Sequence, residues 1–565
     1  MQKSLQFLDY VVFLVYFAIV AGYGIYIYQK KKRKTADSKD FFLAEGSLTW
    51  WAIGASLIAS NISAEQFIGM AGSGFNIGLA ISTYEWMAAA TLIIVAVFFL
   101  PIYLKNKIYT MPQFLLRRYN KTVSTIMAVF WLLLYVVVNL TSILYLGALA
   151  INTISGINFE VCMILLAVFA VFITLGGMKV IGYTDVIQVF FLIMGGLATT
   201  YLALNLVSEH FGETGVLKGF HLITQHAGDH FHMILKRNDP HYLDLPGLSI
   251  LVGGMWIVNL NYWGCNQYIT QRALGADLKT ARSGLLFAGF LKLLMPLIVV
   301  LPGIAAYVLH SQGLFQSEML KDGVTNADNA YPVLMNLLPI GMKGLAFAAH
   351  TAAIVASLAG KANSISTIFS LDIYKEHFAK DADERHVVRV GKIVVIVAMI
   401  LAIIISPFLG IEKGGFKFIQ EYTGFVSPGI FAMFLLGFFW KRTTPGAALF
   451  AMVGGFAMSI ILKVLPKWTD LSGLSGIGFS AISPDSKLYE IPFLDRMGIV
   501  FVVCVIVMIL ISLLAPAKVK VAGAELVDES KGLEVDASMF RTSMPFAITA
   551  ILICGILVAL YTIFW

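Results

Sequence analysis

Long apolar runs separated by short polar segments dominate the chain from one end to the other. A run of about 18 or more apolar residues is long enough to cross the hydrocarbon core of a bilayer as a helix. The chain has too many such runs for the core of a soluble domain, so the pattern predicts an all-α polytopic membrane protein with fourteen transmembrane helices. The predicted spans are residues 8–28, 48–74, 79–104, 124–154, 158–175, 182–206, 247–270, 284–309, 341–372, 386–408, 415–440, 445–465, 496–516 and 543–564.

Two of the predicted spans are interrupted by polar side chains. The interruption in span 48–74 consists of Asn61, Ser63, Glu65 and Gln66, and the one in span 247–270 consists of Asn259, Asn261, Asn266 and Gln267. Polar groups at membrane depth are tolerated only where they are buried in protein or line a wet cavity. The interruptions therefore predict that the protein moves something polar across the bilayer. The alternative is that the amides only hold helices together.

The positions of the two interruptions predict an internal repeat. Five spans separate the starts of the interrupted spans, and the two spans cross in opposite directions, as in a 5+5 inverted repeat with a discontinuous first helix in each half. We therefore divide the chain into an N-terminal extra helix with a basic inner loop, a first repeat, an outer loop, a second repeat, and three C-terminal helices. These are residues 1–47, 48–206, 207–246, 247–440 and 441–565.

Composition and charge agree with a membrane location. The chain is 58% hydrophobic and 13% charged, with a mean hydropathy of +0.82. The predicted inner segments hold 25 lysines and arginines and the outer ones 11, which places both termini outside the plasma (inner) membrane. The net charge of +7 follows from this bias and does not indicate nucleic acid. The run KKKRK directly after the first span marks that span as an anchor.

Two lysines fall inside predicted spans, Lys292 and Lys361. An intramembrane ammonium group is costly, so it must be paired, neutral or in contact with a cavity, and such residues are usually functional. The alternative is that the side chain extends to the interface while its aliphatic part stays in the membrane. Both readings are open for each lysine.

Other residue patterns give no sign of enzyme chemistry. The four cysteines lie in apolar spans without disulfide or metal spacing, and the histidines of loop 207–246 lack tight carboxylate partners. We interpret the cysteines as core residues and that loop as solvated. Because no nucleophile–base pair, metal motif or phosphate-binding loop appears, we expect that the protein is not an enzyme. The inner segment 517–542 reads as a flexible linker.

Several long motifs resemble the solute:sodium symporter family, within it most nearly the bacterial sodium/galactose symporters and their sodium/glucose co-transporter relatives. They include ASLIASNISAEQFIGMAGSGFNIGLAISTYEWM, NYWGCNQYITQR and FIQEYTGFVSPGIFAMFLLGFFWKRTTP. The resemblance covers essentially the whole chain. It implies the leucine-transporter-type inverted-repeat fold, with discontinuous helices and fourteen crossings.

The resemblance also implies a sugar site. The positions that match sugar contacts of the family are Gln66, Glu85, Asn259, Lys292 and Gln420, with Asn61 nearby. Amides, a carboxylate and an ammonium group offer the donors and acceptors that sugar hydroxyls need. Tyr262 matches the inner gate, and Met70, Tyr84 and Phe416 match the outer hydrophobic gate. One position departs, because Ala88 stands where the family has a serine.

The implied sodium site departs further from the family. The matching ligands are the backbone carbonyls of Ala59, Ile62 and Ala353 and the hydroxyl of Ser357, and Asp185 matches a carboxylate on the sodium exit route. A second serine is replaced by Ala356. Lys361 follows Ser357 by four residues, so both lie on one face of a helix. The Lys361 ammonium group could repel sodium, replace it, trade a proton, or point into the inner vestibule.

The expected function is secondary active import of a galactose- or glucose-like hexose by alternating access, with sodium as the coupling ion and the lipid bilayer as surroundings. A sodium-independent or proton-linked carrier of a sugar or polyol, with Lys361 in place of the cation, is the first alternative. A sugar sensor that does not transport is the second. The sequence gives no indication of the oligomeric state.

Overall fold

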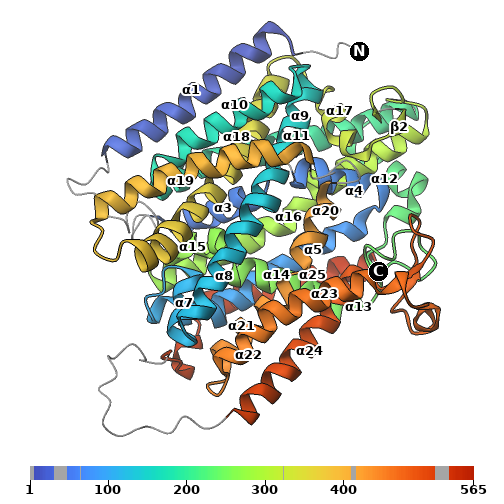
Figure 1. Ribbon diagram of the computed structural model, residues 1–565. Coiled ribbons are helices and arrows are strands. Elements are labelled where there is room, and N and C mark those ends of the chain that lie inside the picture. Colours follow the sequence, from blue (N-terminus) through green and yellow to red (C-terminus); the bar gives the residue numbers. More distant parts are fainter. Residues whose placement is uncertain (1–4, 31–47, 64, 322, 409–414, 516–532) are drawn as a thin grey trace, which may run out of the picture.

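The computed structural model describes residues 5–30, 48–63, 65–321, 323–408, 415–515 and 533–565 (Figure 1). Most of the predicted basic inner loop 29–47 and of the predicted linker 517–542 lies outside the described residues. The described chain folds into a bundle of helices. Two short antiparallel hairpins are the strands that it contains, β1 (Leu320–Lys321) with β2 (Val324–Thr325) and β3 (Ala481–Ile482) with β4 (Tyr489–Glu490).

The described residues of the first half of the chain form twelve α-helices and several π or 3-10 segments. They are α1 (Phe7–Lys30), α3 (Trp50–Asn61), η1 (Glu65–Met70), α4 (Ala71–Asn76), η2 (Leu79–Ser82), α5 (Thr83–Ile94), η3 (Val95–Phe99), α6 (Leu100–Lys105), α7 (Met111–Arg118), α8 (Lys121–Leu133), η4 (Leu134–Leu140), α9 (Thr141–Ser155), α10 (Phe159–Thr174), α11 (Gly177–His210), α12 (Val216–His226), η5 (Gly228–His230) and α13 (Ser249–Val252).

The second half continues in the same way. Its helices are α14 (Gly254–Cys265), α15 (Gln267–Leu274), α16 (Leu278–Ser311), η6 (Ala327–Asn329), α17 (Ala330–Met335), α18 (Met342–Thr367), η7 (Ile368–Phe378), α19 (Glu384–Ile405), η8 (Ser406–Phe408), α20 (Gly415–Gly424), α21 (Ser427–Phe439), α22 (Pro445–Leu449), η10 (Phe450–Gly454), α23 (Gly455–Val464), η11 (Leu465–Lys467), η12 (Ser472–Ile477), α24 (Phe493–Leu514), η13 (Ala537–Phe540) and α25 (Met544–Ile563).

Ten helices of the described chain are long and apolar enough to cross a membrane, and the bent pair α20–α21 makes eleven. Each of the ten coincides with a predicted span. Three further predicted spans, 48–74, 158–175 and 247–270, fall on shorter helices, because two of them are broken and α10 has only 16 residues. The multi-pass prediction is confirmed, and the count of fourteen crossings stays a prediction.

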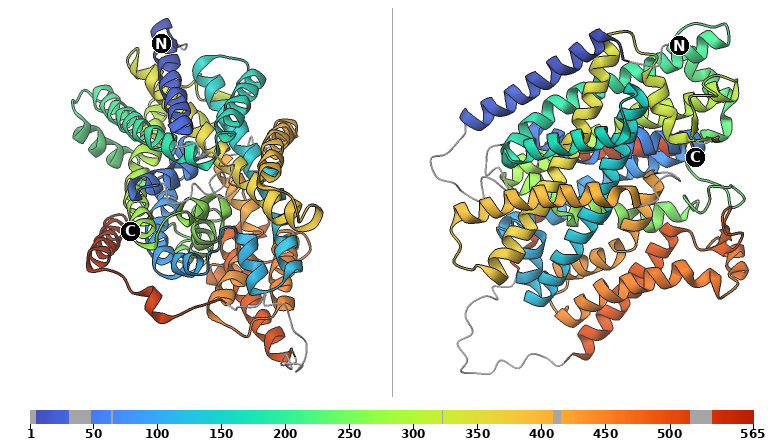
Figure 2. Two further views of the ribbon diagram at one scale, coloured as in Figure 1. Left: turned by 90° about the vertical axis from the view of Figure 1, so that its left-hand side faces the viewer. Right: turned by 45° about the horizontal axis from the view of Figure 1, so that its top comes forward.

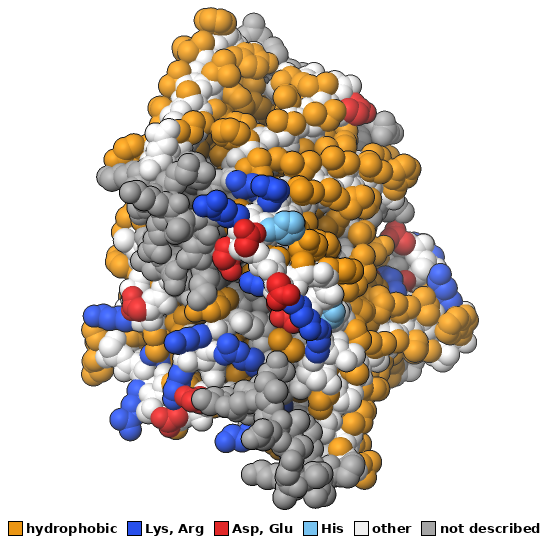
Figure 3. Space-filling view, turned by 60° about the vertical axis from the view of Figure 1, so that its left-hand side comes forward, with side chains coloured by type: hydrophobic (Ala, Val, Ile, Leu, Met, Phe, Trp, Pro, Cys, Tyr) orange, Lys and Arg blue, Asp and Glu red, His pale blue; other side chains and the backbone are white. Residues whose placement is uncertain are grey.

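The helices are layered from the lipid-facing rim to a polar centre. Most of α16 and α18 is buried, whereas α1 and α24 lie at opposite edges of the bundle (Figures 1 and 2). Large apolar side chains of the outer helices are exposed, for example Leu165 on α10 and Ile551 on α25. Figure 3 shows hydrophobic side chains over much of one face, with the charged ones gathered in one part of it. Such a continuous apolar surface fits contact with lipid.

The two ends of the chain lie on the same side as the long loops. Asp9 near the start of α1 accepts hydrogen bonds from the backbone of Gly341 and Gly344 at the start of α18, at 2.7 and 2.9 Å. The loop between α12 and α13 binds the other end, since Met233 donates to the carbonyl of Phe564 at 2.7 Å. The loop is therefore partly packed rather than fully solvated as we expected. The His230 ring stacks on the ring of Tyr307 in α16, and the two ring centroids are 4.0 Å apart.

The charge count placed Arg272 in the inner segment 271–283, between the predicted spans 247–270 and 284–309, and the structure corrects this placement. Arg272 lies within α15 and its side chain is fully buried. Its segment continues the second broken span for one more turn than the hydropathy pattern indicates. The partners of this buried guanidinium belong to the functional site described below.

Candidate functional site

The first broken helix is held open by its own polar side chains. α3 ends at Asn61, and the next residue, Ile62, has extended backbone angles of −79° and 112°. The backbone N–H of Ser63, which would continue the helix to Ala59, donates to Gln66 Oε1 at 3.0 Å instead. The chain resumes in the π-helical segment η1 at Glu65. The carbonyl of Ala59 is thereby released from its helical bond to Ser63 and can bind a cation.

The second broken helix is held open by side chains of other helices. Asn266 separates α14 from α15 with extended backbone angles of −91° and 128°. The Tyr135 hydroxyl donates to Asn266 Oδ1 at 3.0 Å and accepts from the backbone N–H of Gln267 at 3.1 Å. The Tyr103 hydroxyl donates to the carbonyl of Gly264 at 2.7 Å. The broken backbone is therefore satisfied within the protein, as a break at membrane depth requires.

A polar cavity lies between the two broken helices. It has a volume of about 70 Å³. All six predicted sugar-contact residues line it: Asn61, Gln66, Glu85, Asn259, Lys292 and Gln420. The structure thus brings together side chains from α3, η1, α5, α14, α16 and α20. Because pockets for drug-sized ligands have volumes of about 300–1,000 Å³, binding of a sugar requires these side chains to move apart.

Lys292 is the centre of the hydrogen bonding in this cavity. Its ammonium group donates to the carboxylate of Glu85 and to the side-chain oxygen of Asn61. Asn61 donates in turn to the Tyr262 hydroxyl at 3.0 Å. The side chain of Lys292 is 1% exposed and that of Glu85 is 3% exposed, so both charges are buried. Each charge compensates the other. This Lys292–Glu85 pair, as we call it below, leaves the cavity polar but without net charge.

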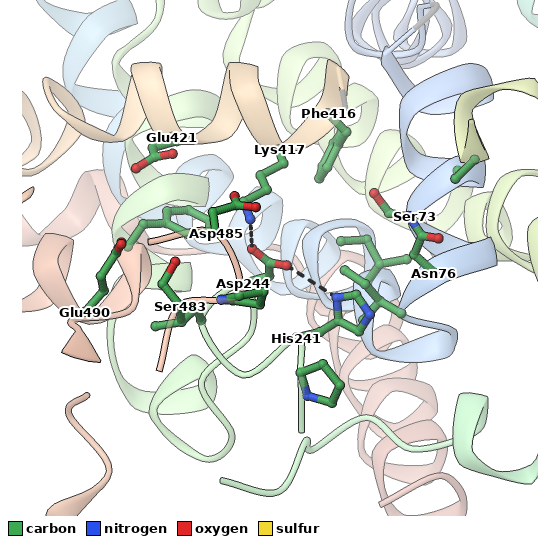
Figure 4. Close-up of a pocket in the computed structure, with 18 of the residues that line it drawn as sticks. Ser73, Asn76, His241, Asp244, Phe416, Lys417, Glu421, Ser483, Asp485 and Glu490 are labelled. Carbon is green, nitrogen blue, oxygen red and sulfur yellow. Dashed lines mark ion pairs between the residues drawn. The ribbon is translucent and has the colours of Figure 1, made fainter. Parts of the chain in front are cut away.

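A second, larger cavity adjoins the first. It has a volume of about 890 Å³ and is called the outer vestibule below (Figure 4). Tyr84 and Phe416 line both cavities, with ring centroids 5.0 Å apart in an edge-to-face arrangement. Gly69 lies directly against the backbone of Phe416 and leaves no room for a Cβ atom there. Met70, the third residue expected at this gate, is buried in η1 and lines neither cavity.

Charged side chains surround the outer vestibule. Asp244 forms ion pairs with Lys417 at 2.8 Å and with His241 at 3.6 Å (Figure 4). Burial raises the pKa of the Asp244 carboxyl, but the hydrogen bond from His241 and the charge of Lys417 outweigh it, so the pKa lies below its usual value. Glu421 pairs with Lys463 at 2.7 Å and with Arg496 at 2.8 Å. The vestibule is therefore lined by paired charged side chains, together with the aromatic rings of Tyr84 and Phe416 that it shares with the first cavity.

One predicted cation residue, Ser357 on α18, contacts the end of α3 beside Ala59. The Ser357 hydroxyl donates to the carbonyl of Ser60 at 3.2 Å. Ala353 precedes Ser357 by one turn on α18, and Ala59 and Ile62 flank Ser60 at the end of α3. Carbonyl and hydroxyl oxygens are suitable ligands for a small hard cation. The residues present fit a sodium ion, with one serine hydroxyl rather than two.

Lys361 points toward this cation site. Its ammonium group donates to the Ser357 hydroxyl at 3.3 Å, and it lies 3.9 Å from Glu65 Oε1 and 4.7 Å from the ring centroid of Tyr268. Lys361 is 1% exposed, so its side chain does not extend into an aqueous inner vestibule, which was the one alternative that concerned its position. Sequence reasoning missed Glu65 as its partner, although Glu65 was visible as one of the polar residues in the break.

A further buried ion pair lies beside the cation site. The Ser56 hydroxyl donates to Asp185 Oδ2 at 2.5 Å and accepts from Arg272 Nε at 2.9 Å. Arg272 Nη2 lies 3.9 Å from the same carboxylate oxygen. The three residues belong to α3, α11 and α15, so they join one half of each broken helix to α11. Asp185 therefore lies beside the cation residues, but an arginine already pairs with it.

Comparison with known proteins agrees with this arrangement. A sequence profile described as "Sodium:solute symporter family" matches residues 41–455. The chain belongs to the sodium:solute symporter family. A sodium/glucose cotransporter of Vibrio parahaemolyticus is 46% identical over 572 residues, which cover 100% of this chain and 99% of that protein. The human sodium/myo-inositol cotransporter 2 is 33% identical over 82% of this chain and 71% of its own length.

The family fold is also found by structural comparison. A solved structure of a Na⁺-coupled sialic acid symporter in a substrate-bound outward-open state superposes with a TM-score of 0.74. The match covers 91% of this chain and 99% of that one at 23% sequence identity. The symporter fold expected from the sequence motifs is thereby confirmed at the level of overall architecture.

Proposed function

We propose that this protein imports a galactose- or glucose-like hexose by alternating access and that sodium is the coupling ion. The observation that carries the proposal is the cavity between the two broken helices, where six polar side chains from six segments converge, among them the Lys292–Glu85 pair. The full-length similarity to a sodium/glucose cotransporter supports the choice of a hexose and of sodium.

The side chains of the cavity suit a neutral polyhydroxylated ligand. An uncharged ligand adds no net charge to a cavity in which Lys292 and Glu85 already compensate each other. Sugar hydroxyls can donate to the carboxylate and accept from the ammonium group, and the amides of Gln66, Asn259 and Gln420 offer both functions. In the proposed mechanism the hydroxyls take over hydrogen bonds that Lys292 now makes to Asn61.

The arrangement of the gates supports an outward-facing starting state. The outer vestibule of about 890 Å³ is separated from the sugar cavity by the edge-to-face pair Tyr84 and Phe416. On the inner side, Arg272, Ser56 and Asp185 join three helices in a buried cluster. In the proposed cycle the aromatic pair opens to admit sugar, and the inner cluster separates after the outer gate has closed.

Sodium would couple to the sugar through the broken helix. The carbonyl of Ala59 lies on α3, that of Ile62 lies directly after α3, and the hydroxyl of Ser357 lies on α18. Gln66 follows Ile62 by four residues along the same broken helix. A ligand that holds α3 against α18 would therefore favour the conformation that positions the sugar residues, and the preference is reciprocal. Each sodium ion that enters down a potential of 100 mV contributes about 2.3 kcal/mol.

We further propose the finer architecture that the sequence motifs imply. In this proposal the fourteen helices include a leucine-transporter-type 5+5 inverted repeat, with repeats at 48–206 and 247–440 and the remaining segments as divided above. The two ends of the chain, which lie on the side of the long loops, would both be outside the plasma (inner) membrane. The protein would act as a carrier and not as an enzyme.

Uptake by proteoliposomes tests the proposed function. Purified protein is reconstituted, and entry of radiolabelled galactose, glucose and myo-inositol is measured under an inward sodium gradient and under a matched potassium gradient. We expect accumulation of at least one hexose above its equilibrium level with sodium and none with potassium. Myo-inositol belongs in the panel because a human relative is named for it. Equal uptake in both gradients would contradict sodium coupling, and no uptake of any hexose would contradict the substrate class.

A further inference from the structure

Lys361 brings a fixed positive charge to the cation site. Its ammonium group is within hydrogen-bonding distance of the Ser357 hydroxyl, the one side-chain ligand among the predicted sodium residues. It also approaches Glu65 to 3.9 Å and the Tyr268 ring to 4.7 Å. The side chain is buried between α18, η1 and α15, and no part of it extends toward an aqueous surface, since it is 1% exposed.

The charges around the cation site already balance without a metal ion. The buried groups form two pairs, Lys361 with Glu65 and Arg272 with Asp185. Arg272 packs directly against Gly360, the residue before Lys361, and leaves no room for a Cβ atom there, so the two pairs are neighbours. A sodium ion added to this cluster would leave one uncompensated positive charge in the membrane, which is costly unless a fixed cation gives way.

The Lys361–Glu65 pair is loosely bound. The distance of 3.9 Å is beyond a hydrogen bond, and within the described residues Glu65 Oε1 receives no hydrogen bond. Glu65 therefore carries a buried oxygen that a closer cation could satisfy. The ammonium group also has a second partner, the face of the Tyr268 ring, which attracts a cation.

We propose that the Lys361 ammonium group is a tethered cation that competes with sodium for the Ser357 end of the cation site. In the absence of sodium, the ammonium group joins α18 to η1 and α15. A bound sodium ion would join α18 to α3 in a similar way. Sodium binds after the ammonium group has moved from Ser357 toward Glu65 and Tyr268. The inference rests on the proposed sodium coupling and specifies its regulation: this chain binds sodium more weakly than it would with an apolar residue at position 361.

Sodium binding measured in the absence of sugar tests the proposal. Purified full-length protein is titrated with radioactive sodium in a scintillation proximity assay, and wild type is compared with Lys361→Met. Two unit charges about 4–5 Å apart interact strongly even at an effective dielectric constant of 20. We therefore expect the sodium concentration for half-saturation to fall about tenfold or more in Lys361→Met.

Two variants control for the loss of a buried lysine. Lys361→Arg keeps the positive charge, and we expect its half-saturation to stay near that of wild type. Lys343→Met removes another buried lysine from the same helix, 18 residues and about 27 Å away along the axis. We expect it to bind sodium as wild type does. Thermal melting of each purified variant shows which of them are folded.

Three outcomes separate the proposal from the function on which it rests. Sodium binding that is equal or weaker in Lys361→Met overturns the competition, and if sodium still drives uptake the proposed function stands. Tighter binding in both Lys361→Met and Lys361→Arg also overturns it, because the charge would not be the cause. If no protein binds sodium while sugar binding persists, both the competition and the sodium coupling fail.

Discussion

The protein contains two buried lysine–glutamate pairs that differ in how closely they are joined. Lys292 donates directly to Glu85 and Asn61, whereas Lys361 lies 3.9 Å from Glu65 and shares its ammonium group with Ser357. Both lysines are about 1% exposed, and both glutamates are buried. The same two residue types therefore form a closed pair in the sugar cavity and an open one at the cation site.

The difference indicates two uses of a buried charge. In a closed pair, each partner satisfies the other, and the pair offers its remaining donors and acceptors to a neutral ligand. In an open pair, a carboxylate oxygen lacks a hydrogen bond and the cation has an alternative partner, so a mobile ion can compete. The predictions below test whether the two pairs are distinct in this sense.

The largest effect is expected from breaking the Lys292–Glu85 pair. Lys292→Met leaves a buried carboxylate without its cation, and such a loss costs about 3–5 kcal/mol. We expect hexose uptake to fall by about a hundredfold or more and the melting temperature to drop. Leu293→Met, at the next position of α16, is the matched control and should leave both unchanged.

The double variant Lys292→Met/Glu85→Met separates folding from binding. With both charges removed, no uncompensated group stays in the cavity, so thermal stability should recover toward wild type while uptake stays lost. Thermal melting and uptake are measured on the same preparations. Recovery of uptake in the double variant would show that the pair has only a structural role.

The next largest effect is expected at the open pair. Ser357→Ala removes the predicted side-chain ligand of sodium, and a hydrogen-bonding group to a charge is worth about 1.5–3 kcal/mol. The sodium concentration for half-maximal uptake should rise about tenfold or more, with the sugar dependence at saturating sodium little changed. Ser366→Ala removes a buried hydroxyl of α18 that donates to Gly391 instead, and its sodium dependence should match wild type.

A smaller effect is expected at the aromatic pair between the two cavities. Phe416→Ala removes the edge-to-face contact with Tyr84, which is worth about 0.5–1.5 kcal/mol beyond its buried area. Sugar binding should weaken about two- to tenfold, measured as the half-saturation of uptake. Phe418→Ala, on the same helix but outside both cavities, should leave the half-saturation unchanged. An equal effect of both variants would argue against a gate.

The smallest effect is expected from Ala88→Ser. Ala88 lines the sugar cavity, and a hydroxyl there would restore the contact that the family motif contains. One hydrogen bond contributes about 0.5–1.5 kcal/mol, so the relative uptake of galactose and glucose should change by about two- to tenfold. Ala90→Ser adds a hydroxyl to α5 outside the cavity and should not change this ratio. An unchanged ratio in both variants would place position 88 outside the contact with the sugar.

The sugar residues were expected from the family motifs, and Gln66, Glu85, Asn259 and Lys292 do line one cavity. Polarity alone predicted less, namely that polar side chains inside apolar spans are buried in protein or line a cavity. The pairing of Lys361 with Glu65 could not be predicted, since it depends on how η1 turns after the break at Ile62. Arg272 was misplaced because hydropathy alone counts a basic residue near a span end as a loop residue.

The position of Met70 shows the same limit. Its place in the family motif implied an outer gate residue, yet Met70 is buried at the end of η1 and lines neither cavity. The sequence does not reveal that the helix changes to π-helical pitch here. Spans and polar faces are thus readable from the pattern, whereas side-chain directions within a distorted helix are not.

The most direct test of the central claim, that sugar and sodium move together, is sodium flux driven by sugar. Proteoliposomes with equal sodium on both sides receive an inward gradient of the transported hexose, and entry of radioactive sodium is followed. The account predicts transient sodium accumulation above equilibrium, which is absent in Lys292→Met. Sugar that equilibrates while the sodium distribution stays constant would contradict coupled transport.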